Sequence, residues 1–196
     1  MVLLQIWVKN MEVSSKKEIR AEVKKHRREA TAEQIHGNSE SICNTFLRLP
    51  EYKEAEYVFV YVDCKNEVET KKVIEQCWKD GKTIAVPKVF GKVMKFYAIT
   101  SFDDLEEGYF GIREPKHECL QETVREDGLM ILPGVAFDEE RHRVGYGGGF
   151  YDKYLEEHPD MKKIAFAFEF QMFDRVPFEV FDRQPEKIIT EKRIIV

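Results

Sequence analysis

The chain has 196 residues, of which 43% are hydrophobic and 34% charged, the composition of a globular protein with one sizeable core. Its formal net charge of −5 excludes the global basic field with which proteins bind nucleic acids. No apolar run approaches the roughly 20 residues of a membrane span. We therefore expect no nucleic-acid partner and no membrane partner, and any anionic ligand must be held by a local positive patch.

The cysteines and the first residues bear on location. Four cysteines are widely spaced with no C-x-x-C pair, which favours reduced thiols in a cytoplasmic protein. The apolar start MVLLQIWV lacks the basic flank and the cleavage site of a secretory signal. Residues 1–13 are expected to form an N-terminal extension, for which disorder and a misassigned start ahead of Met11 both stay open. Residues 14–196 are expected to form a single domain and a monomer.

The first half of the chain predicts two helices and then alternating elements. Ser14 and Ser15 precede a helix over 16–30, and Thr31 with Gln34 forms a capping box for a second helix that runs towards Leu49 and is ended by Pro50. The next elements are expected to be a strand over 55–62, a helix over 69–80 ended by Gly81, and strands over 83–89 and 93–99.

The second half continues the alternation. Residues 100–126 are charged and predict mostly loop, and the apolar run 128–137 predicts a buried strand. A helix over 148–157 and strands over 162–170 and 187–190 complete the chain. This order favours the α/β class, with a largely parallel sheet that is covered by helices on both faces.

The most informative segment is a glycine-rich loop between a predicted strand and a predicted helix. Four glycines fall within residues 145–149, so several backbone N–H groups can approach one anion. The spacing matches neither GxxxxGK[ST] nor GxGxxG, which excludes the two commonest nucleotide loops. A phosphate site and a tight turn without a ligand both remain open. Asp152 just beyond is either a helix cap or a Mg²⁺ ligand.

With these residues in view, the chain resembles the 5-formyltetrahydrofolate cyclo-ligase family, also called methenyltetrahydrofolate synthetases. The resemblance extends over roughly residues 14–193. The matching segments are Lys16-x-x-x-Arg20, NEVET at 66–70, LPGVAFD at 132–138, R-x-GYGGGFYD at 143–152 and D-x-x-x-E-x-I-I-T-E at 182–191.

The resemblance implies a three-layer α/β/α sandwich with a mainly parallel open sheet. It also implies the ATP- and Mg²⁺-dependent cyclisation of 5-formyltetrahydrofolate to 5,10-methenyltetrahydrofolate, with release of ADP and phosphate. The implied route passes through a phosphorylated formyl (imidate) intermediate. Such an enzyme has two small-molecule substrates, ATP and the folate, and its main tasks are alignment and charge neutralisation.

Site residues follow from the matched positions, and no residue is assigned as a general acid or base. Asp152 and Glu186 are the implied Mg²⁺ ligands. The implied folate contacts are Val62, Glu67, Tyr146 and Phe150. The implied ATP-binding residues are Lys16, Arg20, Arg143, Gly145, Tyr146, Gly147, Gly148, Gly149, Phe150 and Tyr151.

The chain departs from the family pattern at three places. Glu186 stands where the family has an aspartate, and Phe181 precedes Asp182 where a histidine is common. Tyr146 and Gly148 stand where some members carry cations inside the glycine loop. The remaining cations, on the predicted first helix and just before the loop, would then carry more of the ATP charge.

Each assignment has a plainer alternative. Lys16 and Arg20 lie four apart on one helical face, but sequence alone favours a solvated basic surface, because further cations lie nearby at Lys17, Lys24, Lys25, Arg27 and Arg28. The family resemblance reverses that preference. A lone glutamate such as Glu67 is more often an exposed loop acid, and the loop aromatics can belong to the core. Two other functions stay open: a non-catalytic folate- or nucleotide-binding module, and a sugar-phosphate isomerase that needs no ATP.

Overall fold

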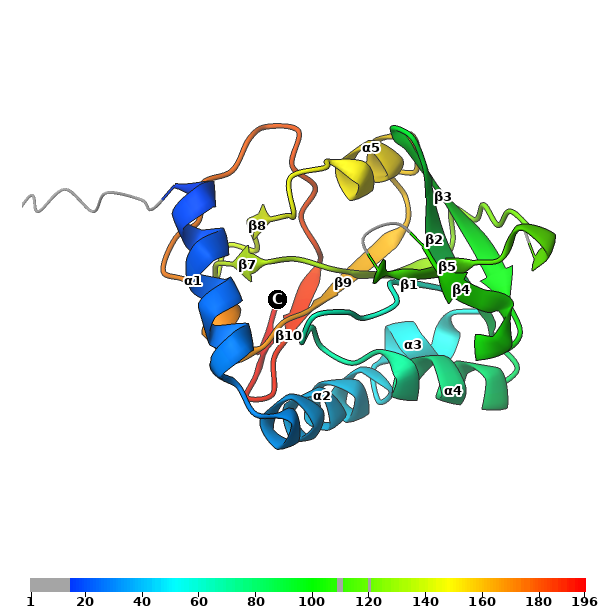
Figure 1. The fold of residues 1–196 in the computed structure, drawn as a ribbon, viewed down its shortest axis with the longest axis horizontal. Coiled ribbons are helices and arrows are strands. Elements are labelled where there is room, and N and C mark those ends of the chain that lie inside the picture. Colours follow the sequence, from blue (N-terminus) through cyan, green and yellow to red (C-terminus); the bar gives the residue numbers. More distant parts are fainter. Residues whose placement is uncertain (1–14, 109–110, 120) are drawn as a thin grey trace, which may run out of the picture.

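The computed structural model of the chain describes residues 15–108, 111–119 and 121–196, so the extension predicted for residues 1–13 lies outside it. A seven-stranded sheet forms its centre (Figure 1). The strands are β1 (Tyr57–Val60), β2 (Thr83–Phe90), β3 (Val93–Ile99), β6 (Leu129–Leu132), β9 (Lys162–Phe166), β10 (Lys187–Ile189) and β11 (Ile194–Ile195). In space they follow the order β11-β10-β9-β6-β1-β2-β3.

The sheet is parallel in its middle and antiparallel at both edges. β2, β1, β6, β9 and β10 pair in parallel, whereas β3 and β11 run antiparallel to their neighbours. Helices cover both faces, which confirms the predicted α/β class and the three-layer sandwich. Because β1 and β6 are parallel neighbours, the loops that follow them begin at the same edge of the sheet.

The first three helices begin at residues that are favourable at a helix amino terminus. α1 (Lys16–Glu29) and α2 (Ala32–Phe46) both begin with a complete capping box, from Ser15 and from Thr31. The predicted end of the second helix was wrong, because α2 stops at Phe46 and Pro50 begins a further helix, α3 (Pro50–Glu54). A proline is favourable there, since the first residue of a helix needs no N–H partner within the helix.

Alternation along the strands divides the core between two faces. In β1, Val58 and Val60 pack under α2, α3 and α4 (Lys71–Lys79), while Phe59 packs on the opposite face, under α5 (Phe150–Glu157). A third, smaller cluster lies under α1. There the buried side chains of α1 pack against the two-stranded ribbon of β7 (Ala136–Phe137) and β8 (Arg143–Val144).

Each of two apolar runs, predicted as a single strand, forms two separate elements in the structure. Residues 128–137 form β6, turn at Pro133 and Gly134, and continue as β7 in the separate ribbon. Residues 162–170 form β9 and then the short 3-10 turn η4 (Glu169–Gln171). At Gly134 a Cβ would lie 2.3 Å from the ring of Phe137, so the turn needs glycine at this position.

The segment predicted to be mostly loop contains some regular structure. β4 (Leu105–Glu107) and β5 (Arg113–Pro115) pair as an antiparallel hairpin, flanked by the 3-10 turns η1 (Phe102–Asp104) and η3 (His117–Cys119). β11 was not predicted at all. Across the described ranges, no helix combines the length and the apolarity that crossing a membrane requires.

Candidate active site

The glycine loop connects β8 to α5 at the edge where the loops after β1 and β6 begin. Gly147 has a φ of +103° and Gly149 a φ of +64°, conformations that glycine adopts with little strain. Gly149 is also the N-cap residue of α5, with no side-chain cap on the helix. The first N–H groups of α5 are therefore directed towards the loop without a side-chain acceptor, an arrangement suited to an anion.

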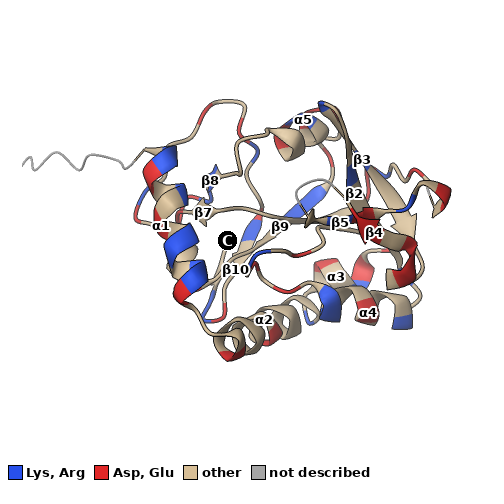
Figure 2. Ribbon diagram, viewed as in Figure 1, with Lys and Arg blue, Asp and Glu red and all other residues tan. Residues whose placement is uncertain are grey.

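The amino-terminal half of α1 brings two predicted cations to this loop. Arg20 donates from Nε to the carbonyl oxygen of Gly145 at 2.8 Å. Lys16 forms an ion pair with Asp182 at 2.9 Å, which joins α1 to the segment after η4. Figure 2 shows, in blue, that Lys and Arg residues recur along the ribbon of α1. The structure thus places both predicted cations beside the glycine loop or the segment next to it.

Arg143 is buried beneath the loop and holds Asp152. It is 5% exposed, donates from Nη1 to the carbonyl of Pro133 at 3.2 Å, and forms a 2.5 Å ion pair from Nη2 to Oδ1 of Asp152. The backbone N–H of Arg183 donates to the same carboxylate oxygen at 3.1 Å. Asp152 lies in the first turn of α5, and these contacts fix its orientation.

The two predicted metal ligands differ in their surroundings. Glu186, beside the first residues of β9 and β10, forms an ion pair with Lys163 at 2.9 Å and also accepts from its backbone N–H. Among the described residues, no three His, Cys, Asp or Glu side chains form a group that could hold a metal ion. Mg²⁺ commonly binds through one or two carboxylates together with substrate phosphates. The donor set at Asp152 therefore fits an ion that arrives with a nucleotide.

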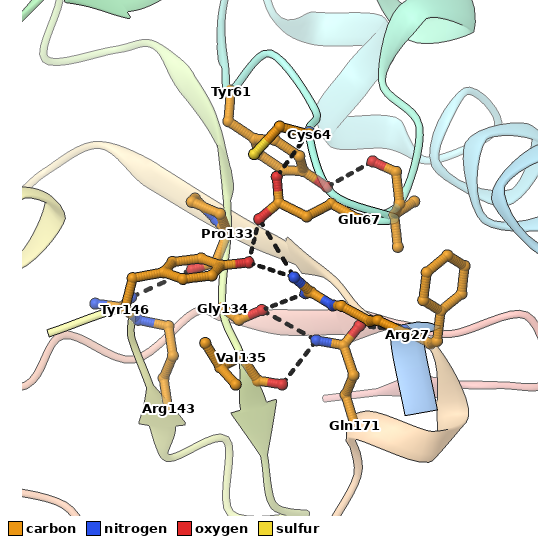
Figure 3. A network of polar contacts seen from close by, with 12 residues as sticks. Arg27, Tyr61, Cys64, Glu67, Pro133, Gly134, Val135, Arg143, Tyr146 and Gln171 are labelled. Carbon is orange, nitrogen blue, oxygen red and sulfur yellow. Dashed lines mark hydrogen bonds and ion pairs between the residues drawn. The ribbon is translucent and has the colours of Figure 1, made fainter. Parts of the chain in front are cut away.

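Tyr146, the second residue of the glycine loop, joins a buried polar network around Glu67 (Figure 3). Glu67 accepts from the backbone N–H of Cys64 at 3.0 Å and from the hydroxyl of Tyr146. Arg27 donates from Nη1 to the same hydroxyl at 2.7 Å and lies 3.7 Å from the Glu67 carboxylate. Glu67 and Arg27 are each 8% exposed, so Glu67 is not the exposed loop acid of the plainer alternative.

The hydroxyl groups of Tyr146 and Tyr151 stay protonated at neutral pH. Burial and the neighbouring carboxylate of Glu67 raise the pKa of Tyr146 and the pKa of Tyr151. Tyr146 as a whole residue is nevertheless 54% exposed, so its hydroxyl lies in the network while the rest of the residue forms an outer wall. Such a wall is suited to stacking against a flat ligand.

Three other predicted contacts are shared with the core. Phe150 and Tyr151 are partly buried against the apolar cluster under α5, and Tyr151 meets Phe96 edge-on at 6.2 Å between ring centroids. Val62 is partly buried against the cluster under α2 and α4. Each of these side chains is therefore anchored by packing, which supports the core alternative for part of its surface.

Arg27 is the site residue that the sequence reasoning missed, because it was grouped with the solvated basic face of α1. Ile19, Val23 and Arg27 are spaced by four and form the buried face of α1. An arginine that continues an apolar i, i+4 series is a usable signal of burial.

Two further polar groups organise the segments around the site. Gln171 donates to the carbonyls of Gly134 at 3.0 Å and Val135 at 2.8 Å, which fixes the turn after β6. His142, to which no role was assigned, contacts the buried Asp138 at 3.0 Å and stacks on Phe178 with 3.7 Å between centroids. Both interactions stabilise the ribbon that leads into the glycine loop.

Comparisons with known proteins agree with this arrangement. The model of the 5-formyltetrahydrofolate cyclo-ligase family matches residues 12–191. A probable 5-formyltetrahydrofolate cyclo-ligase of Schizosaccharomyces pombe is 31% identical over 178 residues, covering 82% of this chain and 87% of the relative. The 5-formyltetrahydrofolate cyclo-ligase of Haemophilus influenzae is 29% identical, with 88% of this chain and 95% of the relative covered.

Solved structures of methenyltetrahydrofolate synthetases have the same fold as this chain. The structure of 5,10-methenyltetrahydrofolate synthetase from Aquifex aeolicus superposes with a TM-score of 0.80 at 32% identity, covering 91% of each chain. A synthetase from Mycoplasma pneumoniae shares the fold, with a TM-score of 0.72 at 20% identity over 91% of this chain and 99% of the other. From the family match over most of its length, this chain belongs to the 5-formyltetrahydrofolate cyclo-ligase family of enzymes.

Proposed function

We propose that the protein catalyses the ATP- and Mg²⁺-dependent cyclisation of 5-formyltetrahydrofolate to 5,10-methenyltetrahydrofolate, with release of ADP and phosphate. Besides family membership, one observation carries the proposal: a single loop contacts two different polar groups. Its flanking residues Arg143 and Asp152 form an ion pair, and its own Tyr146 reaches Glu67. The first group suits a Mg²⁺-bearing triphosphate and the second suits the N–H donors of a pterin ring.

The chemistry explains why the two substrates must meet across one loop. The formamide oxygen of the folate is a poor leaving group, so N10 cannot displace it unaided. Transfer of the γ-phosphoryl group to that oxygen gives a phosphorylated imidate, and attack by N10 then closes the ring as phosphate leaves. Both steps depend on alignment and on neutralising charge, and no side chain is assigned as a general acid or base.

The nucleotide side would use the loop backbone and the cations around it. Residues 145–149 would offer N–H groups to the phosphates, and Lys16 and Arg20 would neutralise charge from α1. Lys16 would exchange its contact with Asp182 for a phosphate oxygen. We keep Asp152 as the residue that would hold Mg²⁺, because Arg143 and Arg183 both contact its Oδ1, whereas Lys163 contacts both carboxylate oxygens of Glu186. The ion would neutralise phosphate charge.

On the folate side, Glu67 would accept hydrogen bonds from the ring. Its two oxygens are held by Cys64 and Tyr146, so the carboxylate is oriented before the ligand arrives. Tyr146 and Phe150 would form a wall of the ring pocket, and Val62 would provide an apolar contact from the end of β1.

The direct test follows the absorbance of methenyltetrahydrofolate formed from 5-formyltetrahydrofolate, ATP and Mg²⁺. We expect product to appear only when both ATP and Mg²⁺ are present, with one ADP per turnover. Binding of both substrates without ADP would instead identify a non-catalytic module. Sugar-phosphate isomerisation without nucleotide would identify the third hypothesis.

Glu67→Gln tests the folate assignment within the same assay. A lost charge-assisted hydrogen bond costs about 1.5–3 kcal/mol, so the KM for the folate should rise roughly 10- to 100-fold while the KM for ATP changes little. Glu69→Gln is the matched control, since Glu69 lies two residues away and pairs with the exposed His36. Equal KM values for the folate in the two variants would contradict the role of Glu67.

A further inference from the structure

Arg27 is a buried arginine near the carboxyl end of α1 for which the family resemblance supplied no role. Its guanidinium donates to the hydroxyl of Tyr146 at 2.7 Å and to the carbonyl of Gly134 at 3.4 Å, and it lies 3.7 Å from the carboxylate of Glu67. These three partners belong to the glycine loop, the loop after β6 and the loop after β1 (Figure 3). One side chain therefore joins the three loops that form the site.

The backbone of Arg27 contacts the same region as its side chain. Asn66 donates from Nδ2 to the carbonyl oxygen of Arg27 at 2.7 Å. Asn66 has a φ of +59° and precedes Glu67 directly, so this bond fixes an unusual backbone conformation next to the carboxylate. The end of α1 thus holds the loop that carries Glu67 through two independent contacts.

The charge of Arg27 is matched to its surroundings. Burial opposes the charged form, but Tyr146 and Glu67 outweigh it and raise the pKa of Arg27 above its ordinary value. A buried carboxylate that has no neighbouring cation favours its protonated form, which is a poorer acceptor for ligand N–H groups. Arg27 supplies the cation that faces Glu67 at 3.7 Å.

We propose that Arg27 is a positioning and specificity-determining residue, which holds Glu67 as an oriented and charged acceptor for the N–H groups of the folate ring. The inference rests on the proposed function in that its ligand is a reduced folate. Arg27 should control folate affinity and leave ATP affinity nearly unchanged. The reason is that the cations proposed for ATP lie earlier on α1 and have other partners. Arg20 contacts Gly145, and Lys16 contacts Asp182.

A pH profile can separate this role from a purely structural one. The groups that surround Glu67 besides Arg27 are Tyr61, Cys64, Tyr146 and Tyr151. Burial raises the pKa of each of the four, that of Cys64 to about 12. None of these four groups changes charge between about pH 5 and 9. A pH dependence of folate binding that appears in Arg27→Met, and not in the wild type or in Arg28→Met, therefore reports on the polar network that Arg27 faces.

The experiment compares Arg27→Met with Arg28→Met, which removes the neighbouring exposed arginine. Calorimetry measures the Kd of 5-formyltetrahydrofolate without ATP at about pH 6 and about pH 8.5, and steady-state kinetics give the KM for ATP. We expect Arg27→Met to raise the folate Kd roughly 10- to 100-fold, more at the lower pH, and to change the ATP KM less than about 3-fold. Arg28→Met should match the wild type.

Arg27→Lys is the rescue variant, because it keeps the charge and loses the planar fork. It should recover the shallow pH profile of the wild type with part of its affinity, and it decides the question if Arg27→Met fails to fold. An unchanged folate Kd in the folded variants, or equal losses for folate and ATP, would overturn the role of Arg27.

The proposed activity and the role of Arg27 fail separately. Folate binding that depends on Arg27 without any ATP-driven turnover would overturn the activity alone. Turnover with no Arg27 dependence would overturn the positioning role alone. A folded wild-type protein that binds no folate would overturn both.

Discussion

The site around the glycine loop has two ends that are built on different principles. At the fixed end, Arg143 and Asp152, which flank the loop in sequence, form a short ion pair that backbone groups of Pro133 and Arg183 hold in place. At the adaptable end, Tyr146 within the loop is 54% exposed and reaches the buried Glu67 with its hydroxyl. The fixed end is oriented before any ligand arrives, whereas the exposed part of Tyr146 can move at small cost. One loop thus combines a fixed anion site with an adaptable wall.

Asp152→Ala should have the largest effect, because it removes the fixed end. It leaves Arg143, which is 5% exposed, without its carboxylate, and breaking one side of a buried ion pair costs about 3 kcal/mol of unfolding free energy. It also removes the residue proposed to hold Mg²⁺, so turnover should fall by roughly 100-fold or more. Urea denaturation and a Mg²⁺ titration of turnover measure the two effects.

Two companion variants separate these contributions. Asp152→Asn keeps an acceptor for Arg143 and Arg183 but loses the charge, so it should lose less stability than Asp152→Ala and still require more Mg²⁺. Glu156→Ala removes an exposed acid from the same helix and should change stability by less than about 0.5 kcal/mol. An unchanged Mg²⁺ dependence in both Asp152 variants would leave Asp152 as a helix cap only.

Tyr146→Phe should affect only the adaptable end. It removes one hydrogen bond from Glu67 and one from Arg27, so we expect the KM for the folate to rise about 10-fold with little change in the KM for ATP. Because both partners are buried, the unfolding free energy should also fall by about 1–3 kcal/mol. In the wild type, burial raises the pKa of Tyr146 above the ordinary value of 10.0, so the hydroxyl stays protonated and folate affinity should hold up to about pH 9.

Tyr57→Phe is the control for Tyr146→Phe, since it removes a hydroxyl at the start of β1, away from the loops that follow the strands. Folate kinetics of this variant should match the wild type. A rise in the ATP KM of Tyr146→Phe as large as its rise in the folate KM would show that the two ends of the site act as one.

The same contrast explains what the sequence could and could not predict. The start of α1 after Ser15, the capping box of α2 and the glycine loop between a strand and a helix follow from local spacing, and they were found where predicted. The position of Asp152 in the first turn of α5 is local as well. Arg27 and Tyr146 meet Glu67 across 40 and 79 positions of the chain, and no local rule predicts such contacts. The partner of Glu186 depends likewise on how β9 and β10 pair.

Local rules also failed where one residue type has two uses. Pro50 was read as the end of a helix, although proline is equally common at the first position of one. The run 128–137 was read as one strand because it is apolar throughout, and the turn at Gly134 depends on space next to Phe137. In both cases tertiary packing decides between conformations that the local sequence allows.

The smallest predicted effect concerns the glycine at the junction of loop and helix. Gly149 has a φ of +64°, and a Cβ built there would find open space, so Gly149→Ala tests the backbone conformation alone. An L-residue in the left-handed region costs about 1–2 kcal/mol. Gly37 also has open space but lies inside α2, where alanine is favoured over glycine by about 1 kcal/mol. Gly149→Ala should therefore lower the unfolding free energy and Gly37→Ala should raise it.

If Gly149→Ala also raised the KM for ATP several-fold while Gly37→Ala did not, the fixed end of the site would extend to the first N–H groups of α5. Shifts of the same sign in the two unfolding free energies would show that the loop tolerates a different backbone conformation and is less fixed than its ion pair suggests.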